Sequence, residues 1–100
     1  MSDAPPPRIL SIAGSDSSGG AGIQADIKTI TMLGGYAMTA LTAITAQNTR
    51  GVQGVEPLPP QFVLDQVASC LSDIGADAIK IGMLGSPETA RLLAEQLDTF

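Results

Sequence analysis

A strand, a loop of small residues and a helix follow one another over residues 11–28, and this segment constrains the fold more than any other. An apolar run over residues 9–13 breaks at Gly14, and helical spacing resumes from about Ala21. The loop is rich in glycine, with Gly14, Gly19, Gly20 and Gly22. Such a loop lets a small ligand approach the backbone and the free N–H groups of the helix. A tight structural turn is the alternative, because glycine-rich turns between strands and helices are common.

The loop matches neither of the two best-known glycine motifs. Gly14 and Gly19 have the separation of a P-loop, but Gly20 stands where that motif requires lysine. No register of these glycines gives the dinucleotide-binding pattern. We expect Gly20 to be kept free of a side chain, either for backbone approach or because its φ is positive.

Hydrophobic periodicity predicts an α/β fold with a largely parallel sheet and helices on its faces. Glycine and proline mark the ends of the elements: Gly34 and Gly75 end helices, and Pro60 and Pro87 begin them. In chain order, the predicted elements are a strand at 8–13, a helix at 21–33, a strand in the second half of 36–46, a short edge strand at 51–58, a helix from 59 to 74, a buried strand at 78–81 and a last helix capped by Ser86. The inward-facing residues of the first helix are predicted to be Ile23, Ile27, Ile30 and Leu33. Those of the second helix are predicted to be Val63, Val67, Cys70, Leu71 and Ile74.

Composition narrows the class of protein. The chain has 100 residues, a net charge of −5 and 5 scattered basic residues. Without a basic stripe, nucleic acid is not expected as a partner, although a small phosphorylated substrate is not excluded. The single cysteine, Cys70, is expected to be a buried apolar residue. No apolar stretch is long enough to span a membrane and no secretory signal is present, so we expect a cytoplasmic protein.

The sequences of the two chain ends lead to two further predictions. Residues 1–7 contain three consecutive prolines and are expected to form a flexible tail before a single domain over residues 8–100. The helical pattern continues to Phe100 without a stop signal, so we expect a natural N-terminus and a truncated C-terminus.

A ligand is expected beyond the carboxyl ends of the strands. Gly14 follows the first predicted strand, Thr45 and Gln47 lie at the end of the second, and Met83 follows the last. The Gln47 amide suits the edge of a heterocycle, and the Met83 thioether suits a ring face. The alternatives are a turn residue for Gln47 and core filler for Met83.

Two charged residues lie among apolar ones. Asp26 falls on the inward arc of its helix, where it either holds the loop through Ser15, Ser17 or Ser18 or contacts the ligand directly. Lys80 interrupts an apolar strand and is expected to extend to solvent or to pair with an acid. The chain has no histidine, so neither a histidine triad nor a histidine metal site is possible. The residues alone predict a small-molecule site without a complete catalytic constellation.

Three motifs resemble the hydroxymethylpyrimidine/phosphomethylpyrimidine kinases of thiamine biosynthesis, in the ribokinase-like superfamily. They are SIAGSDSSGGAGIQADIKT at 11–29, TAITAQNTRGV at 42–52 and KIGML at 80–84, in the family's order. The resemblance covers residues 8–100 and implies the N-terminal part of a three-layer α-β-α sandwich around a mainly parallel sheet.

The resemblance also implies a function. Members of the family phosphorylate the hydroxymethyl group of an aminopyrimidine with ATP and Mg²⁺ and then add a second phosphate. Carried over by position, the residues of the pyrimidine site are Gly14, Ala21, Thr45, Gln47 and Met83, with Asp26 near the pocket. Thr45 is the weakest transfer, because relatives can have an apolar residue there. Dimers are usual in the family.

The family's ATP site, anion hole and catalytic aspartate lie in its C-terminal half, so no catalytic or metal residue is expected in this segment. Two alternatives remain open. One is a pyridoxal-type kinase of the same superfamily, and the other is a binding module that keeps the pocket without phosphoryl transfer.

Overall fold

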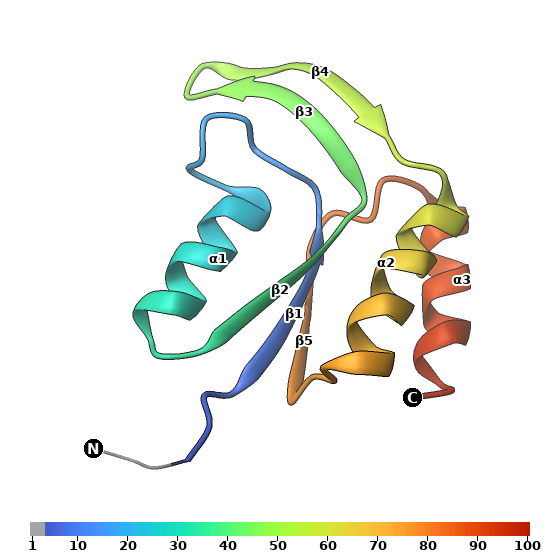
Figure 1. Cartoon of the computed structure of the whole chain (residues 1–100). Helices are drawn as coiled ribbons and strands as arrows, with labels where there is room; N and C mark the ends of the chain where they lie inside the picture. Colours follow the sequence, from blue (N-terminus) through green and yellow to red (C-terminus); the bar gives the residue numbers. More distant parts are fainter. Residues whose placement is uncertain (1–3) are drawn as a thin grey trace.

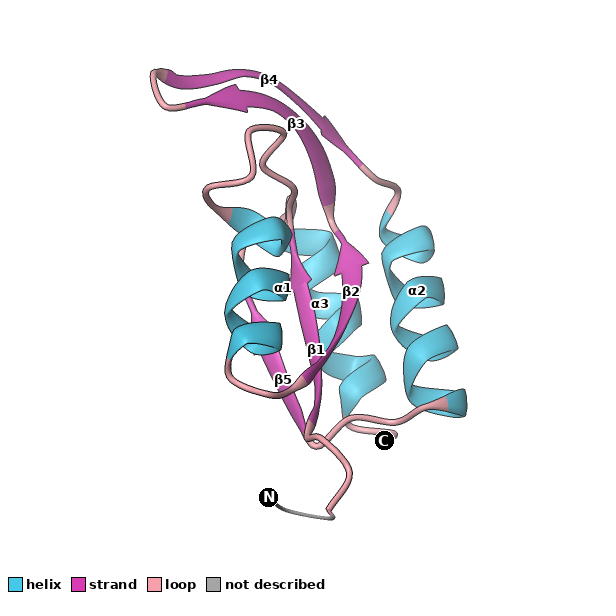
Figure 2. Ribbon diagram, turned by 60° about the vertical axis from the view of Figure 1, so that its left-hand side comes forward, coloured by secondary structure: helices cyan, strands magenta, loops and turns pink. Residues whose placement is uncertain are grey.

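The computed structural model describes residues 4–100 and shows three layers (Figure 1). The middle layer is a parallel sheet of β1 (Arg8–Ala13), β2 (Tyr36–Leu41) and β5 (Ala78–Ile81), in the order β2-β1-β5. Helix α1 (Gly22–Met32) covers one face, and α2 (Pro60–Asp73) and α3 (Pro87–Leu97) cover the other (Figure 2). The α/β class and the parallel sheet predicted from periodicity are therefore confirmed.

The core lies between the sheet and the pair α2 and α3. Alternate residues of β1 face opposite layers, so Leu10 and Ile12 enter this core while Ser11 faces α1. The core consists of Leu10, Ile12, Met38, Ala40, Val63, Val67 and Leu93. The side facing α1 is less apolar: Ile23 is buried, whereas Ile27 is 38% and Leu33 is 83% exposed. The predicted inward stripe of α1 is thus only partly correct.

A second sheet stands beyond the carboxyl ends of the parallel strands (Figure 1). It is an antiparallel hairpin of β3 (Ala43–Asn48) and β4 (Gly51–Pro57), with a bulge between Ala46 and Gln47. The prediction of one strand in the second half of 36–46 is wrong, because the chain forms β2, turns at Thr42 and then forms β3. Thr45 and Gln47 consequently lie within the hairpin rather than at the end of a strand of the parallel sheet.

The boundaries of the other helices and strands agree closely with those predicted from the sequence, but three other predictions need correction. Strand β5 was predicted to be buried, but its four residues are exposed because it is an edge strand that pairs with β1 alone in the described part of the chain. Cys70 is half-buried at the margin of the core. Ser86 caps helix α3 as predicted and accepts a hydrogen bond from the Thr89 amide, but the helix ends at Leu97 instead of running through Phe100.

The predicted tail over residues 1–7 lies partly outside the described residues, which begin at Ala4. Residues 5–7 are exposed and have no regular secondary structure. The Pro7 carbonyl accepts a hydrogen bond of 2.8 Å from the Tyr36 amide, which fixes the start of β1 beside β2.

Candidate functional site

The loop over residues 14–21 is organised by the Asp16 carboxylate. This carboxylate accepts hydrogen bonds from the Ser18 amide and hydroxyl and from the amides of Gly20 and Ala21, at 2.7–3.0 Å. The Ser18 hydroxyl contributes most to a pKa below the usual range for Asp16, and the backbone amides add to it against partial desolvation. Asp16 thus holds the loop in one shape. An aspartate followed by Ser-Ser-Gly is the local signal that predicts such a turn.

Glycine is required at specific points of this loop. The φ angles of Gly19 and Gly22 are +87° and +58°. A Cβ on Gly22 would lie 2.5 Å from the Gly14 carbonyl oxygen, the acceptor of the Ile23 amide. The φ of Gly20 is not positive, and a Cβ there would meet only Asp16 Oδ2 at 3.7 Å. The expectation that Gly20 needs to lack a side chain is therefore not supported by the backbone, and Gly22 is the demanding position.

Two serines of the loop fasten it to the hairpin. Ser15 accepts a bond from the Thr45 amide through its hydroxyl, and its carbonyl accepts one from the Thr45 hydroxyl, at 3.0 and 2.8 Å. The Ser17 hydroxyl donates to the Gln47 carbonyl and accepts from the Gln47 amide, both at 2.8 Å. The loop therefore runs along β3 and bonds to alternate residues, as a neighbouring strand would. This pairing holds Thr45 and Gln47 over the loop.

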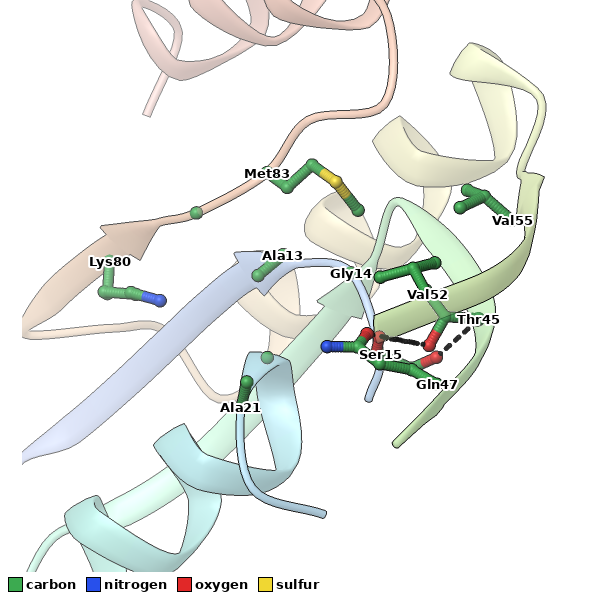
Figure 3. Close-up of a pocket in the computed structure, with 12 residues that line it drawn as sticks. Ala13, Gly14, Ser15, Ala21, Thr45, Gln47, Val52, Val55, Lys80 and Met83 are labelled. Atoms are coloured by element: carbon green, nitrogen blue, oxygen red, sulfur yellow. Dashed lines mark hydrogen bonds between the residues drawn. The ribbon is translucent and has the colours of Figure 1, made fainter. Parts of the chain in front are cut away.

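The walls of a cavity of about 310 Å³ come from the loop, the hairpin and the segment after β5 (Figure 3). This volume is at the lower end of the range for small-molecule sites. The lining residues are Ala13, Gly14, Ser15, Ala21, Gly22, Thr45, Gln47, Val52, Val55, Lys80, Gly82 and Met83. Five of the six residues that the sequence predicts for the site are among them, and Asp26 is not.

Gln47 and Met83 lie on different walls of this cavity (Figure 3). The half-buried Gln47 has its Oε1 3.2 Å from the Thr45 hydroxyl oxygen. Met83 is 51% exposed, so it is not core filler. Its Cε would lie 2.6 Å from a Cβ on Gly14, and the lack of a side chain at Gly14 therefore leaves room for the thioether. An amide on one side and a thioether on the other suit a flat polar ring between them.

Asp26 does not line the cavity but bonds to Lys80, which does, and its partners differ from those expected. Its Oδ2 accepts hydrogen bonds from the Ser11 hydroxyl at 2.6 Å and from Lys80 Nζ at 2.8 Å. Partial burial opposes ionisation, but the bonds from Lys80 and Ser11 outweigh it and hold the pKa of Asp26 below its usual range. The expectation that Asp26 holds the loop through Ser15, Ser17 or Ser18 is wrong, since Asp16 has that role. The expectation that Lys80 pairs with an acid is confirmed.

Several lining residues were not predicted from the sequence. Val52 and Val55 are contributed by β4, and the loose apolar alternation of residues 51–58 was the signal for them. Lys80 supplies the single charged side chain among the lining residues. Lys80 carries a positive charge at the wall of an otherwise neutral cavity, and its ion pair with Asp26 compensates that charge.

The described part of the chain offers no evident metal centre. Among residues 4–100, no three or more His, Cys, Asp or Glu side chains are grouped so that they could hold a metal ion. Within the same residues, no helix combines the length and the apolar character needed to cross a membrane.

Comparison with known proteins gives one consistent family. Residues 16–100 match the family of phosphomethylpyrimidine kinases. The bifunctional thiamine biosynthesis protein ThiED of Geobacter sulfurreducens is 56% identical over 97% of this chain and 20% of its own length. The hydroxymethylpyrimidine/phosphomethylpyrimidine kinase of Mycobacterium leprae is 52% identical over 92% of this chain and 35% of its own. The chain thus spans about a third or less of the curated relatives it matches.

Solved structures agree with these relatives. The phosphomethylpyrimidine kinase of Clostridium difficile superposes with a TM-score of 0.89 at 50% identity, covering 93% of this chain and 40% of that one. The pyridoxal kinase of Staphylococcus aureus, in complex with AMP-PCP and pyridoxal, gives a TM-score of 0.82 at 44% identity over 94% of this chain and 35% of its own. The fold is accordingly that of these kinases, over the part that the chain covers.

Proposed function

Because the chain belongs to the phosphomethylpyrimidine kinase family, we propose that its protein phosphorylates 4-amino-5-hydroxymethyl-2-methylpyrimidine, and then the monophosphate, for thiamine biosynthesis. The observation that carries the proposal is the identity of about half the residues with proteins named hydroxymethylpyrimidine/phosphomethylpyrimidine kinase. The cavity supports it, because it combines a small volume, a carboxamide and a thioether at the carboxyl edge of the sheet.

In this proposal the chain binds and orients the pyrimidine. The ring lies between Met83 and the hairpin, and the Gln47 amide bonds to its polar edge. Gly14 and Ala21 leave space for the ring beside the loop, and Thr45 supports the Gln47 amide. Asp26 does not line the cavity and acts by holding the side chain of Lys80. Binding of this kind contributes to catalysis by fixing the primary alcohol for in-line attack.

ATP and Mg²⁺ are part of the proposal as phosphoryl donor and metal. The related pyridoxal kinase was solved with AMP-PCP, which supports a nucleotide as the donor. Residues 4–100 offer no cluster of metal ligands, so we assign none of these residues to the metal and no step to it. Assembly as a homodimer and a cytoplasmic location go with the same proposal, and sedimentation and cell fractionation test them.

Pyridoxal kinase is the second candidate, since solved pyridoxal kinases superpose almost as well as the pyrimidine kinase. Sequence identity favours the pyrimidine as the substrate, because it is 50% with the phosphomethylpyrimidine kinase and 43–45% with the pyridoxal kinases. A structure described as the last common ancestor of HMPPK and PLK/HMPPK vitamin kinases is 54% identical to this chain, which is compatible with one pocket architecture serving both substrates.

A coupled ADP-release assay with hydroxymethylpyrimidine, its monophosphate and pyridoxal tests the proposal on the protein as its gene encodes it. We expect turnover of both pyrimidines and slower turnover of pyridoxal. Turnover of pyridoxal alone would assign the protein to the second candidate. Calorimetric binding of the pyrimidine without any turnover would instead identify a non-catalytic binding module.

A further inference from the structure

Thr42 connects all the walls of the cavity without lining it. It stands between β2 and β3 and is 1% exposed. Its amide donates to the Ala13 carbonyl at 3.0 Å, and its carbonyl accepts from the Leu58 amide at 2.9 Å. Its hydroxyl donates to the Met83 carbonyl at 2.6 Å. Each of its polar groups therefore has a partner, and each partner belongs to a different segment.

These partners are the points where the walls of the cavity begin. Ala13 ends β1 and precedes Gly14, the first residue of the loop. Leu58 follows β4, so its bond to Thr42 closes the hairpin where the chain leaves it. Met83 lies across the cavity from the hairpin residues Thr45 and Gln47 (Figure 3). The distance between the two ring-facing walls is consequently fixed at Thr42.

Gly85 supplies an independent observation at the same place. Its φ is +84°, and a Cβ there would lie 3.3 Å from the Thr42 carbonyl oxygen. A glycine at this position lets the segment after β5 pass close to the Thr42 backbone. The Met83 carbonyl is thereby kept within reach of the Thr42 hydroxyl, and the Met83 side chain reaches over Gly14.

We propose that Thr42 is a positioning residue for pyrimidine recognition: through its hydroxyl it sets the spacing between Met83 and the hairpin that carries Gln47. The inference rests on the proposed function, because the ring is what the spacing fits. The hydroxyl is the group that matters. It is the part of Thr42 that reaches the Met83 segment, whereas the backbone bonds secure the loop and the hairpin.

Two substitutions at one position separate the hydroxyl from the shape of the side chain. Thr42→Val keeps the shape and removes the donor to the Met83 carbonyl, and Thr42→Ser keeps the donor. We expect Thr42→Val to raise the KM and the calorimetric Kd for hydroxymethylpyrimidine about tenfold, with the KM for ATP unchanged. Thr42→Ser should stay close to the wild type in both constants.

Thr89→Val is the matched structural control. Thr89 is 2% exposed, its hydroxyl accepts a hydrogen bond from the Ser86 hydroxyl at the start of α3, and it does not line the cavity. This variant loses a comparable buried hydroxyl contact, so we expect it to lower the midpoint of thermal unfolding but to leave pyrimidine affinity unchanged. The contrast separates positioning from general stability.

Hydrogen exchange gives a readout that needs no substrate. In Thr42→Val, the amides of residues 82–85 and of the hairpin should exchange faster than in wild type and in Thr89→Val. Normal pyrimidine affinity and normal exchange in Thr42→Val, with stability lowered as in Thr89→Val, would overturn the inference. If the wild-type protein bound no pyrimidine, the proposed function would fail, and the exchange data would still decide whether Thr42 holds the two walls.

Discussion

Replacement of Gly22 by alanine tests the geometry of the loop most directly, because two separate costs coincide there. The φ of +58° places an alanine in the left-handed region, which costs about 1–2 kcal/mol for a residue with a Cβ. The new Cβ would also lie 2.5 Å from the Gly14 oxygen and 3.1 Å from the Asp16 nitrogen. These are backbone atoms, so relief requires movement of the loop and not a side-chain rotation.

The clash adds to the conformational cost. The Gly14 oxygen is bonded to the Ile23 amide, and the Asp16 amide donates to the Gln24 side chain. Both atoms are therefore fixed to the helix that the new methyl would push against. Forced overpacking of this kind costs about 1–3 kcal/mol, which gives a total loss of about 2–5 kcal/mol in the free energy of unfolding.

Two other glycines serve as matched controls for the two costs. Gly34 has φ +89° and open space around a Cβ, so Gly34→Ala carries the conformational cost alone, about 1–2 kcal/mol. Gly20 has neither a positive φ nor a close contact, so Gly20→Ala should be neutral or stabilising by about 0.4–1 kcal/mol. The expected order of stability is Gly20→Ala above Gly34→Ala above Gly22→Ala.

Urea unfolding of the three variants measures this order, provided that the dependence on denaturant is the same in each. Calorimetry on the same samples should show weaker pyrimidine binding in Gly22→Ala, because a displaced loop moves Gly14 from its place in the cavity wall. A Gly22→Ala protein as stable as Gly34→Ala would show that the close approach to Gly14 does not exist in solution, and the reasoning about the loop would be refuted.

Two further predictions concern single polar side chains. Gln47→Ala should weaken pyrimidine binding by about 1–3 kcal/mol in calorimetry and leave ATP affinity and thermal stability nearly unchanged. Replacement of the exposed Gln61 by alanine serves as the control. A large loss of stability at unchanged pyrimidine affinity would make Gln47 a structural residue. Hydrogen bonds from Arg8 hold the pKa of Asp77 at about 2 against an ordinary 3.8, so its stabilising effect is complete above about pH 4 and is lost as the pH falls through about 2. Asp77→Asn should therefore flatten the fall in unfolding free energy across that window relative to the wild type; a slope equal to that of the wild type would contradict the Arg8 assignment.

The parts of the fold that the sequence predicts well are those set by local chemistry. Glycine and proline mark the helix ends, and an apolar run over residues 9–13 marks β1. The break at Thr42 has no such signal, because neither glycine nor proline occurs between Tyr36 and Asn48. The chain changes sheets there because Thr42 bonds to Ala13, Leu58 and Met83, which are distant in the sequence. The prediction of one strand failed for that reason.

In the candidate site too, residues set by local chemistry were predicted, whereas contacts between distant segments were not. Gly14 and Met83 follow strands whose ends are visible in the sequence, and the resemblance to a family adds Ala21. Thr45 and Gln47 are predicted to lie at the end of a strand that the structure divides into β2 and β3. The pairing of Lys80 with Asp26 depends on the register of β5 against β1, which places Lys80 beside Ser11 under α1. Such a contact follows from topology and cannot be derived from spacing along the chain.

The serines of the loop show why small side chains in a binding loop are not interchangeable. A loop shaped only for backbone approach would do as well with glycine at Ser15 and Ser17. In the structure both hydroxyls bond to β3, Ser15 at Thr45 and Ser17 at Gln47, so they hold the hairpin as well as leaving space. Glycine is needed where the backbone turns or nearly touches itself, and serine where the loop must bond to the strand. The order of Ser and Gly in residues 14–22 therefore encodes the position of the hairpin that carries Gln47, as well as the room for a ligand.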